Sequence, residues 1–186
     1  MSLKKWVSHA GSVVTGSLVL FCSVGPGNAT GNELSRILGA YECSLAGLIA
    51  RIHAYPNPDD YQNRFIVVDS AANPSGYVQC AFDHRDREAL CEAASGFYAA
   101  PGETPQFAPD SRAALARLGF SLDGQHGNFG KRLRFSPEVD PDSLARFMLT
   151  ALHDGFGANE YSVLQVQAPD AMPHGILPKA ACPQIS

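Results

Sequence analysis

Charge is scarce in this sequence of 186 residues, of which 17% are Asp, Glu, Lys or Arg. The net charge is −4, and the lysines and arginines form no cluster. Residues 1–29 contain Lys4 and Lys5 but no acid, which leaves −6 for the remainder. Nucleic acids and anionic lipid surfaces are bound by basic patches. The composition therefore argues against nucleic acid and against a membrane surface as partner of the folded body.

Sequence motifs for metal, nucleotide and nucleophile chemistry are also missing. The five cysteines and six histidines form no CxxC, HxxxH or HxH pair, and no Gly-x-Ser-x-Gly elbow, Walker fingerprint or EF-hand loop occurs. Residues 83–86 read Asp-His-Arg-Asp, as in a kinase catalytic loop, but the asparagine that should follow is absent. We interpret them as a solvated turn, and we expect no catalytic residues, no metal and no cofactor.

The N-terminal segment has the pattern of a secretory signal. Lys4 and Lys5 precede an apolar run over residues 13–24, and Ala29 offers a small residue for cleavage before Thr30. The run is shorter than the ~20 apolar residues of a spanning helix. We expect residues 1–29 to be a signal peptide and the protein to be periplasmic or secreted. The alternatives are an uncleaved anchor, a core helix of a cytoplasmic protein and a mistaken start site.

Cleavage there would leave an even number of cysteines, namely Cys43, Cys80, Cys91 and Cys182. If the corner between the second and third strands is symmetric about residues 85 and 86, Cys80 and Cys91 lie directly opposite each other. They are then within reach of a cross-strand disulfide. In a reducing compartment the same two residues would be buried thiols instead.

The body begins with an amphipathic helix over residues 32–54, capped by Asn32 and ended by Pro56. Its apolar residues recur at intervals of three and four. They are Leu34, Ile37, Leu38, Tyr41, Leu45, Leu48, Ile49 and Ile52. A helix of this length with one apolar face must pack that face against a sheet or a partner.

Three segments of strand length follow between residues 64 and 98, separated by turns, and predict an antiparallel meander. Both faces of residues 65–68 are apolar, which predicts a central strand covered on both sides. The third segment is read as running from Ala89 to Tyr98.

A second helix is expected over residues 109–118, a strand over 131–136, a helix from Pro141 to Phe156 and a short strand over 162–167. The prolines after residue 168 predict an irregular tail to residue 186. A single domain over residues 30–167 follows. Its fold class is α+β, with an antiparallel sheet of about five strands and helices packed against it in the order α-βββ-α-β(β)-α.

With its predicted helices and strands in this order, the chain resembles the chaperone-like superfamily that includes type III secretion chaperones (the Tir-chaperone fold) and the YbjN-like proteins. The resemblance covers about residues 32–165. The residues that carry it are Tyr77-Val-Gln79, Glu92, Leu118-Gly-Phe120, Asn128-Phe129, Leu144-Ala145, Leu149, Leu152 and Phe156-Gly157.

The resemblance implies a protein- or peptide-binding module without enzymatic activity that often forms homodimers and holds extended segments of a partner. An export signal departs from the secretion chaperones, which are cytosolic. We predict partner contacts at Tyr77, Gln79, Phe97 and Tyr98, and the alternative for each is an ordinary core position.

A rival hypothesis is a small exported hydrolase or a toxin-neutralising protein with its site in the loop from Ser121 to Gly130. His126 would be its base, but we favour the interpretation of this residue as a solvated loop histidine.

Overall fold

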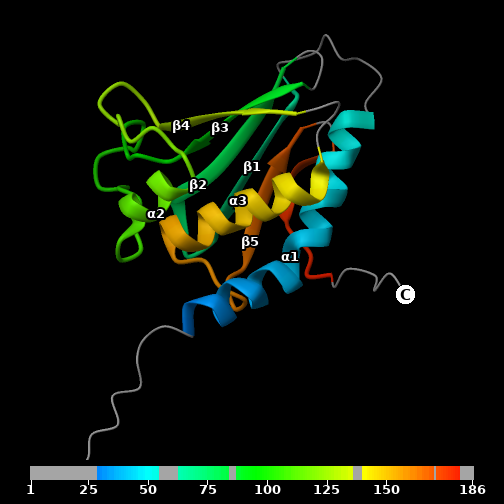
Figure 1. Cartoon of the computed structure of the whole chain (residues 1–186), viewed down its shortest axis with the longest axis horizontal. Helices are drawn as coiled ribbons and strands as arrows, with labels where there is room; N and C mark the ends of the chain where they lie inside the picture. The colour runs from blue at the N-terminus through cyan, green and yellow to red at the C-terminus, as the bar shows by residue number, and fades with distance from the viewer. Residues whose placement is uncertain (1–28, 55–62, 84–86, 136–139, 170, 181–186) are drawn as a thin grey trace, which may run out of the picture.

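The computed structural model describes residues 29–54, 63–83, 87–135, 140–169 and 171–180 (Figure 1). They form α1 (Ala29–Ala54), β1 (Phe65–Ser70), β2 (Asn73–Phe82), β3 (Glu88–Ala93), α2 (Ser111–Arg117), β4 (Phe129–Arg134), α3 (Pro141–Phe156), β5 (Leu164–Ala168) and β6 (Met172–Ile176). This order confirms the α+β class. The expected signal segment up to residue 28, residues 84–86 of the charged corner, and Cys182 lie outside the described residues.

The strands form one antiparallel sheet in the spatial order β4-β3-β2-β1-β5-β6. The described part of the chain thus holds six strands rather than about five. The additional strand, β6, lies in the tail that was expected to be irregular. In the sequence, Pro173 argues against a strand. An edge strand, however, tolerates a residue without a backbone N–H. The Leu177 N–H, directly after β6, donates a bond of 2.9 Å to the Leu164 carbonyl and closes the hairpin.

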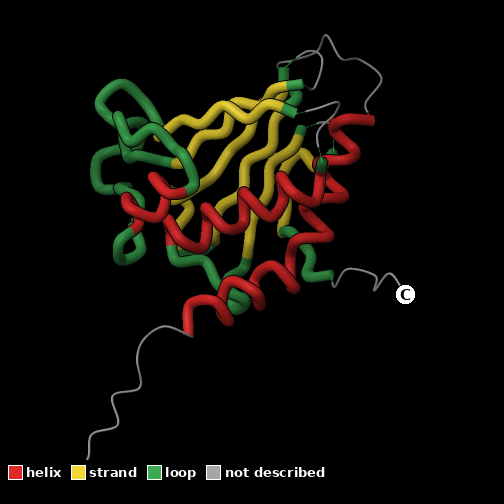
Figure 2. Tube along the Cα trace, in the orientation of Figure 1, coloured by secondary structure: helices red, strands yellow, loops and turns green. Residues whose placement is uncertain are grey.

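All three helices lie on one side of the sheet (Figures 1 and 2). The helix α3 packs directly on β1, β2 and β3, and both α1 and α2 pack against α3. The apolar stripe predicted for α1 is the face that it buries, with Leu34 and Leu38 at the margin. Its fully buried members are Ile37, Tyr41, Leu45, Leu48, Ile49 and Ile52.

The bounds of α3 agree with the sequence prediction because both of its ends are fixed by local chemistry. The Asp140 side chain accepts a bond of 3.1 Å from the Asp142 N–H, and Pro141 starts the helix. At the other end Gly157 adopts a φ of 74°, a left-handed conformation that favours glycine. The buried face of α3 includes Leu144, Met148, Leu149 and Leu152.

Side chains alternate across the sheet between a face covered by helices and a face that no described helix covers. On β1, Ile66 and Val68 are buried under the helices, whereas Phe65, Val67 and Asp69 point the other way and are half-buried. The prediction that β1 is central is confirmed, but within the described residues helices cover only one of its two faces. The strand has a neighbour on each side, which shields its apolar residues laterally.

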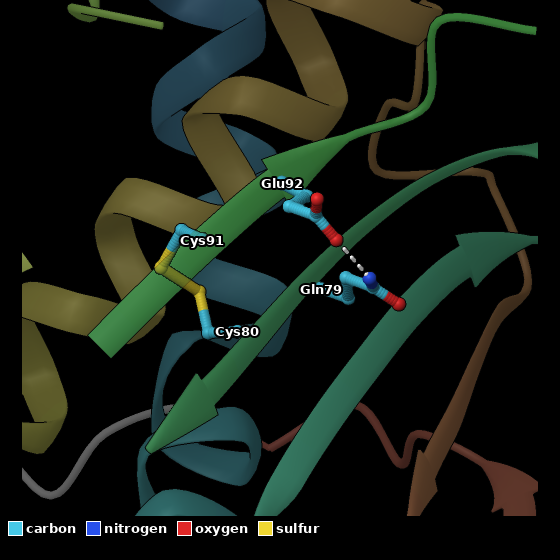
Figure 3. Close-up of a disulfide and its surroundings, with 4 residues drawn as sticks. All are labelled: Gln79, Cys80, Cys91 and Glu92. Carbon is cyan, nitrogen blue, oxygen red and sulfur yellow. Dashed lines mark hydrogen bonds between the residues drawn. A yellow bond between two sulfur atoms is a disulfide. The ribbon is translucent and has the colours of Figure 1, made fainter. Parts of the chain in front are cut away.

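The hairpin of β2 and β3 has the register that a symmetric corner predicts. Cys80 pairs with Cys91, with their Cα atoms 4.0 Å apart, and their sulfur atoms are bonded (Figure 3). Both cysteines are fully buried on the helix-covered face. Cys43 in α1 is also disulfide-bonded.

Candidate functional site

The candidate site is the sheet face that no described helix covers, called here the open face. The strand registers place its residues in rows that cross the sheet. One row is Arg132, Leu90, Ala81 and Phe65. The next row is Gly130, Glu92, Gln79, Val67 and Gln167, and the third is Tyr77, Asp69, Gln165 and Ile176. The open face thus combines apolar, amide and charged side chains, and its Leu90 and Ile176 are 42% and 65% exposed.

Gln79 occupies the middle of this face, as a partner-contacting residue should. It pairs with Glu92 of β3, and the amide Nε2 donates a hydrogen bond to the Glu92 Oε2 (Figure 3). This bond lies beside the Cys80–Cys91 disulfide, and the two neighbouring pairs join the same strands on opposite faces of the sheet. Gln79 therefore offers a partner its Oε1 acceptor and the second hydrogen of its Nε2.

Tyr77 lies at the end of the open face and is held there by a residue far away in the sequence. Asn128, which is only 9% exposed, donates a bond of 2.9 Å from Nδ2 to the Tyr77 hydroxyl. The Asn128 Oδ1 in turn accepts a bond of 3.3 Å from the Ser95 N–H. These bonds leave the Tyr77 ring half-buried and fix its orientation.

Phe97 and Tyr98 are not in a strand, which corrects the prediction that the third strand reaches residue 98. β3 ends at Ala93, because Gly96 takes a φ of 89° and turns the chain away from the ladder. The loop is anchored by Ser95, whose hydroxyl donates a bond of 2.7 Å to the Gly127 carbonyl. Phe97 and Tyr98 are 50% and 67% exposed, and their rings meet edge to face at 4.9 Å between centroids.

Two of the predicted contact residues, Tyr77 and Tyr98, line one small hollow of about 140 Å³. Its other lining residues are Ser75, Ala94, Gly96, Ala99, Ala100, Glu103 and Asn128. Glu103 is the one charged residue in this set, and its side chain has no bonding partner among the described residues. Sequence reasoning missed Glu103, which stands in a Pro- and Gly-rich loop without periodicity. Gln79 and Phe97 do not line the hollow.

Asp69 is the neighbour of Tyr77 across the β1–β2 ladder and was also missed. Its Oδ1 is buried without a hydrogen-bond partner among the described residues. This burial raises the pKa of Asp69 to about 6, and the positive charge of His174 on β6 opposes the rise in part. Alternation along β1 would have placed Asp69 on the open face, but the depth at which it lies depends on its neighbours.

A larger hollow of about 730 Å³ lies elsewhere, between the start of α1, α2 and the end of α3. Four of the ionisable groups that line it are paired with each other, and Glu33, Asp110 and Arg117 line it as well. Arg36 contacts Glu160 at 2.7 Å, and the His153 Nδ1 lies 2.6 Å from the Asp154 Oδ1. We favour the open face as the binding surface, since it exposes apolar side chains such as Leu90 and Ile176.

The loop from Ser121 to Gly130 carries no assembled catalytic group. His126 is exposed and makes no hydrogen bond within the described parts of the chain, and the Ser121 N–H is bonded to the Gly130 carbonyl at 2.8 Å. Across the same parts of the chain, no three His, Cys, Asp or Glu residues are placed to hold a metal. Nor does any described helix combine the length and apolar character needed to cross a membrane.

The described part of the chain is thus an antiparallel sheet with helices on one face and an open, partly apolar face on the other. Residues 40–170 match a family model described as T3SS (YopN, CesT) and YbjN peptide-binding chaperone 3 (TY-Chap3). The match spans more than half of the chain, and the protein belongs to this family. The resemblance drawn from the sequence is thereby confirmed. No curated protein and no solved structure matches the chain.

Proposed function

We propose that this protein is a non-enzymatic chaperone that holds an extended segment of a partner protein against the open face. The observation that carries the proposal is the exposure of apolar and aromatic side chains on a sheet face without a described helix, in a family of peptide-binding chaperones. Leu90 is exposed on β3 and Ile176 on β6, and Tyr77, Val67 and Phe65 are half-buried on the strands β2 and β1 between them. Apolar surface of this kind gains free energy when a partner covers it.

The strand edges favour docking on the face over addition of a strand. Added strands need a free row of N–H and C=O groups along an edge. On β4 the Gly130 carbonyl is already taken by the Ser121 N–H, and the edge strand β6 contains Pro173. A segment lying across the open face meets neither obstacle.

A photo-crosslinking amino acid at position 90 tests this proposal. Leu90 is exposed on the open face, and Arg51, exposed on α1, provides the matched control position. We expect the position-90 variant to crosslink one dominant partner in the native host and the position-51 variant to crosslink none. A product that contains a second copy of this chain would assign the open face to a homodimer. Equal products from both positions, or none from position 90, would contradict the proposal.

We further propose that the protein acts after export, in the periplasm or outside the cell. The Cys80–Cys91 disulfide supports this, because disulfides persist in oxidising compartments. Mass spectrometry of the protein from its host tests it through the N-terminal peptide. We expect a mature N-terminus at Thr30. An uncleaved N-terminus together with free thiols at Cys80 and Cys91 would contradict the proposed location.

A further inference from the structure

The hollow between Tyr77 and Tyr98 has the size and chemistry of a pocket for one side chain. An engineered protein cavity of about 150 Å³ holds a benzene molecule, and this hollow measures about 140 Å³. It therefore has room for one long side chain and none for a helix. Its position at the end of the open face makes it continuous with the surface proposed to hold the partner, and the inference below rests on that proposed function.

The walls of the hollow are fixed before any partner arrives. Asn128 is held by both Tyr77 and the Ser95 N–H, and the Ser95 hydroxyl is held by Gly127. Further along the same loop the Asn73 amide exchanges two bonds with the Gln106 backbone, at 2.7 and 3.1 Å. A loop anchored at both ends presents its residues with little loss of conformational entropy on binding.

The electrostatics of the hollow select one class of side chain. Glu103 supplies the one charge among its lining residues, and its exposed side chain has no bonding partner within the described chain. The faces of the two tyrosine rings attract cations. A second carboxylate, Asp69, lies beside Tyr77 across the ladder. Residues 30–186 carry a net charge of −6, which favours a partner of opposite sign.

We infer that the hollow binds a lysine or arginine side chain of the partner segment, with its apolar stem against Tyr77 and Tyr98 and its charged end at Glu103. The other occupants are less suited. An acidic side chain would be repelled by the exposed Glu103 carboxylate, and an apolar one would make no favourable electrostatic contact with it. Asp69 provides a second contact for a cation further along the same segment.

A positional library of acetylated and amidated octapeptides tests this with the full-length protein. Each sub-library fixes one position as Lys, Arg, norleucine or Glu and randomises the others. For the wild-type protein we expect Lys or Arg to be retained about tenfold better than norleucine at one position. We expect Glu103→Gln and Tyr98→Ala to lose most of this preference, and Glu33→Gln, an exposed carboxylate on α1, to keep it.

The outcomes separate the two proposals. Equal retention of Lys and norleucine, or a preference that persists in a folded Glu103→Gln variant, overturns the basic-side-chain inference and leaves peptide binding standing. Retention of no sub-library above a protein-free column overturns the proposed function itself. Raising the salt concentration from 50 to 500 mM should weaken the Lys preference, because exposed charge pairs are screened, and a preference insensitive to salt would argue against Glu103.

Discussion

The Asn128 side chain donates a hydrogen bond of 2.9 Å to the Tyr77 hydroxyl across 51 residues of sequence. The bond ties β2, in the middle of the sheet, to the loop that precedes β4. The site depends on this connection, because the same asparagine also fixes Ser95 at the base of the loop that carries Tyr98.

Replacing Tyr77 by phenylalanine should remove this bond and leave a buried amide donor without its partner. We expect a loss of about 1 kcal/mol in the free energy of unfolding, measured by urea titration. Tyr161, which is 81% exposed, gives the matched control, and Tyr161→Phe should change the stability by less than about 0.5 kcal/mol. Equal losses in both variants would contradict the structural role assigned to the bond.

Removing the Cys80–Cys91 disulfide should destabilise the hairpin. The bridge spans 11 positions in the chain, and closing a loop of that size restricts the unfolded state by about 3 kcal/mol in the chain-entropy estimate. The Cys80→Ala/Cys91→Ala double variant should lose stability of this order in urea. Alkylation of the denatured, unreduced wild-type protein should leave both cysteines unmodified, and their labelling would show that the bridge is absent.

Asp69 should make stability depend on pH in the range between its two pKa values. Its pKa is about 6 in the folded protein and 3.8 as the ordinary value. The folded state therefore binds more protons between these values, and the contribution of Asp69 to stability declines as the pH rises through 6. Asp69→Asn should therefore gain about 1 kcal/mol at pH 8, after allowance for solvent screening, and little at pH 4.

Unfolding titrations at both pH values measure this difference, with Glu33→Gln as the control for an exposed carboxylate. A variant Asp69→Asn that is less stable than the wild type at pH 8 would show that the carboxylate has a favourable partner.

Gly76 of β2 has no room for a side chain, so its replacement by a larger residue should destabilise the protein. A Cβ atom there would lie 2.8 Å from the Phe156 Cδ1 and 2.5 Å from the Asn73 Nδ2. Gly76→Ala should therefore cost about 1–3 kcal/mol in the free energy of unfolding through overpacking. Gly130 of β4, with no atom within 4 Å of its Cβ position, is the matched control. If Gly130→Ala destabilised the protein as much, the loss at Gly76 could not be assigned to overpacking, because Gly→Ala without strain stabilises a protein by restricting the unfolded chain.

The sequence by itself determined the elements whose signals are local. Repeats of three and four residues placed α1, and Asp140, Pro141 and Gly157 fixed the bounds of α3. The symmetry assumed about residues 85 and 86 predicted the register that brings Cys80 opposite Cys91. The same local reasoning erred for Phe97 and Tyr98, where Gly96 ends the strand.

Only the tertiary structure decided which face of β1 is open and which residues meet at the hollow. Both faces of β1 are apolar, so alternation could not say which one the helices cover; the packing of α3 on the sheet did. Tyr77, Tyr98, Glu103 and Asn128 come from β2 and two irregular loops. Side-chain hydrogen bonds between distant residues set the paths of those loops, and no periodicity in the sequence encodes such bonds.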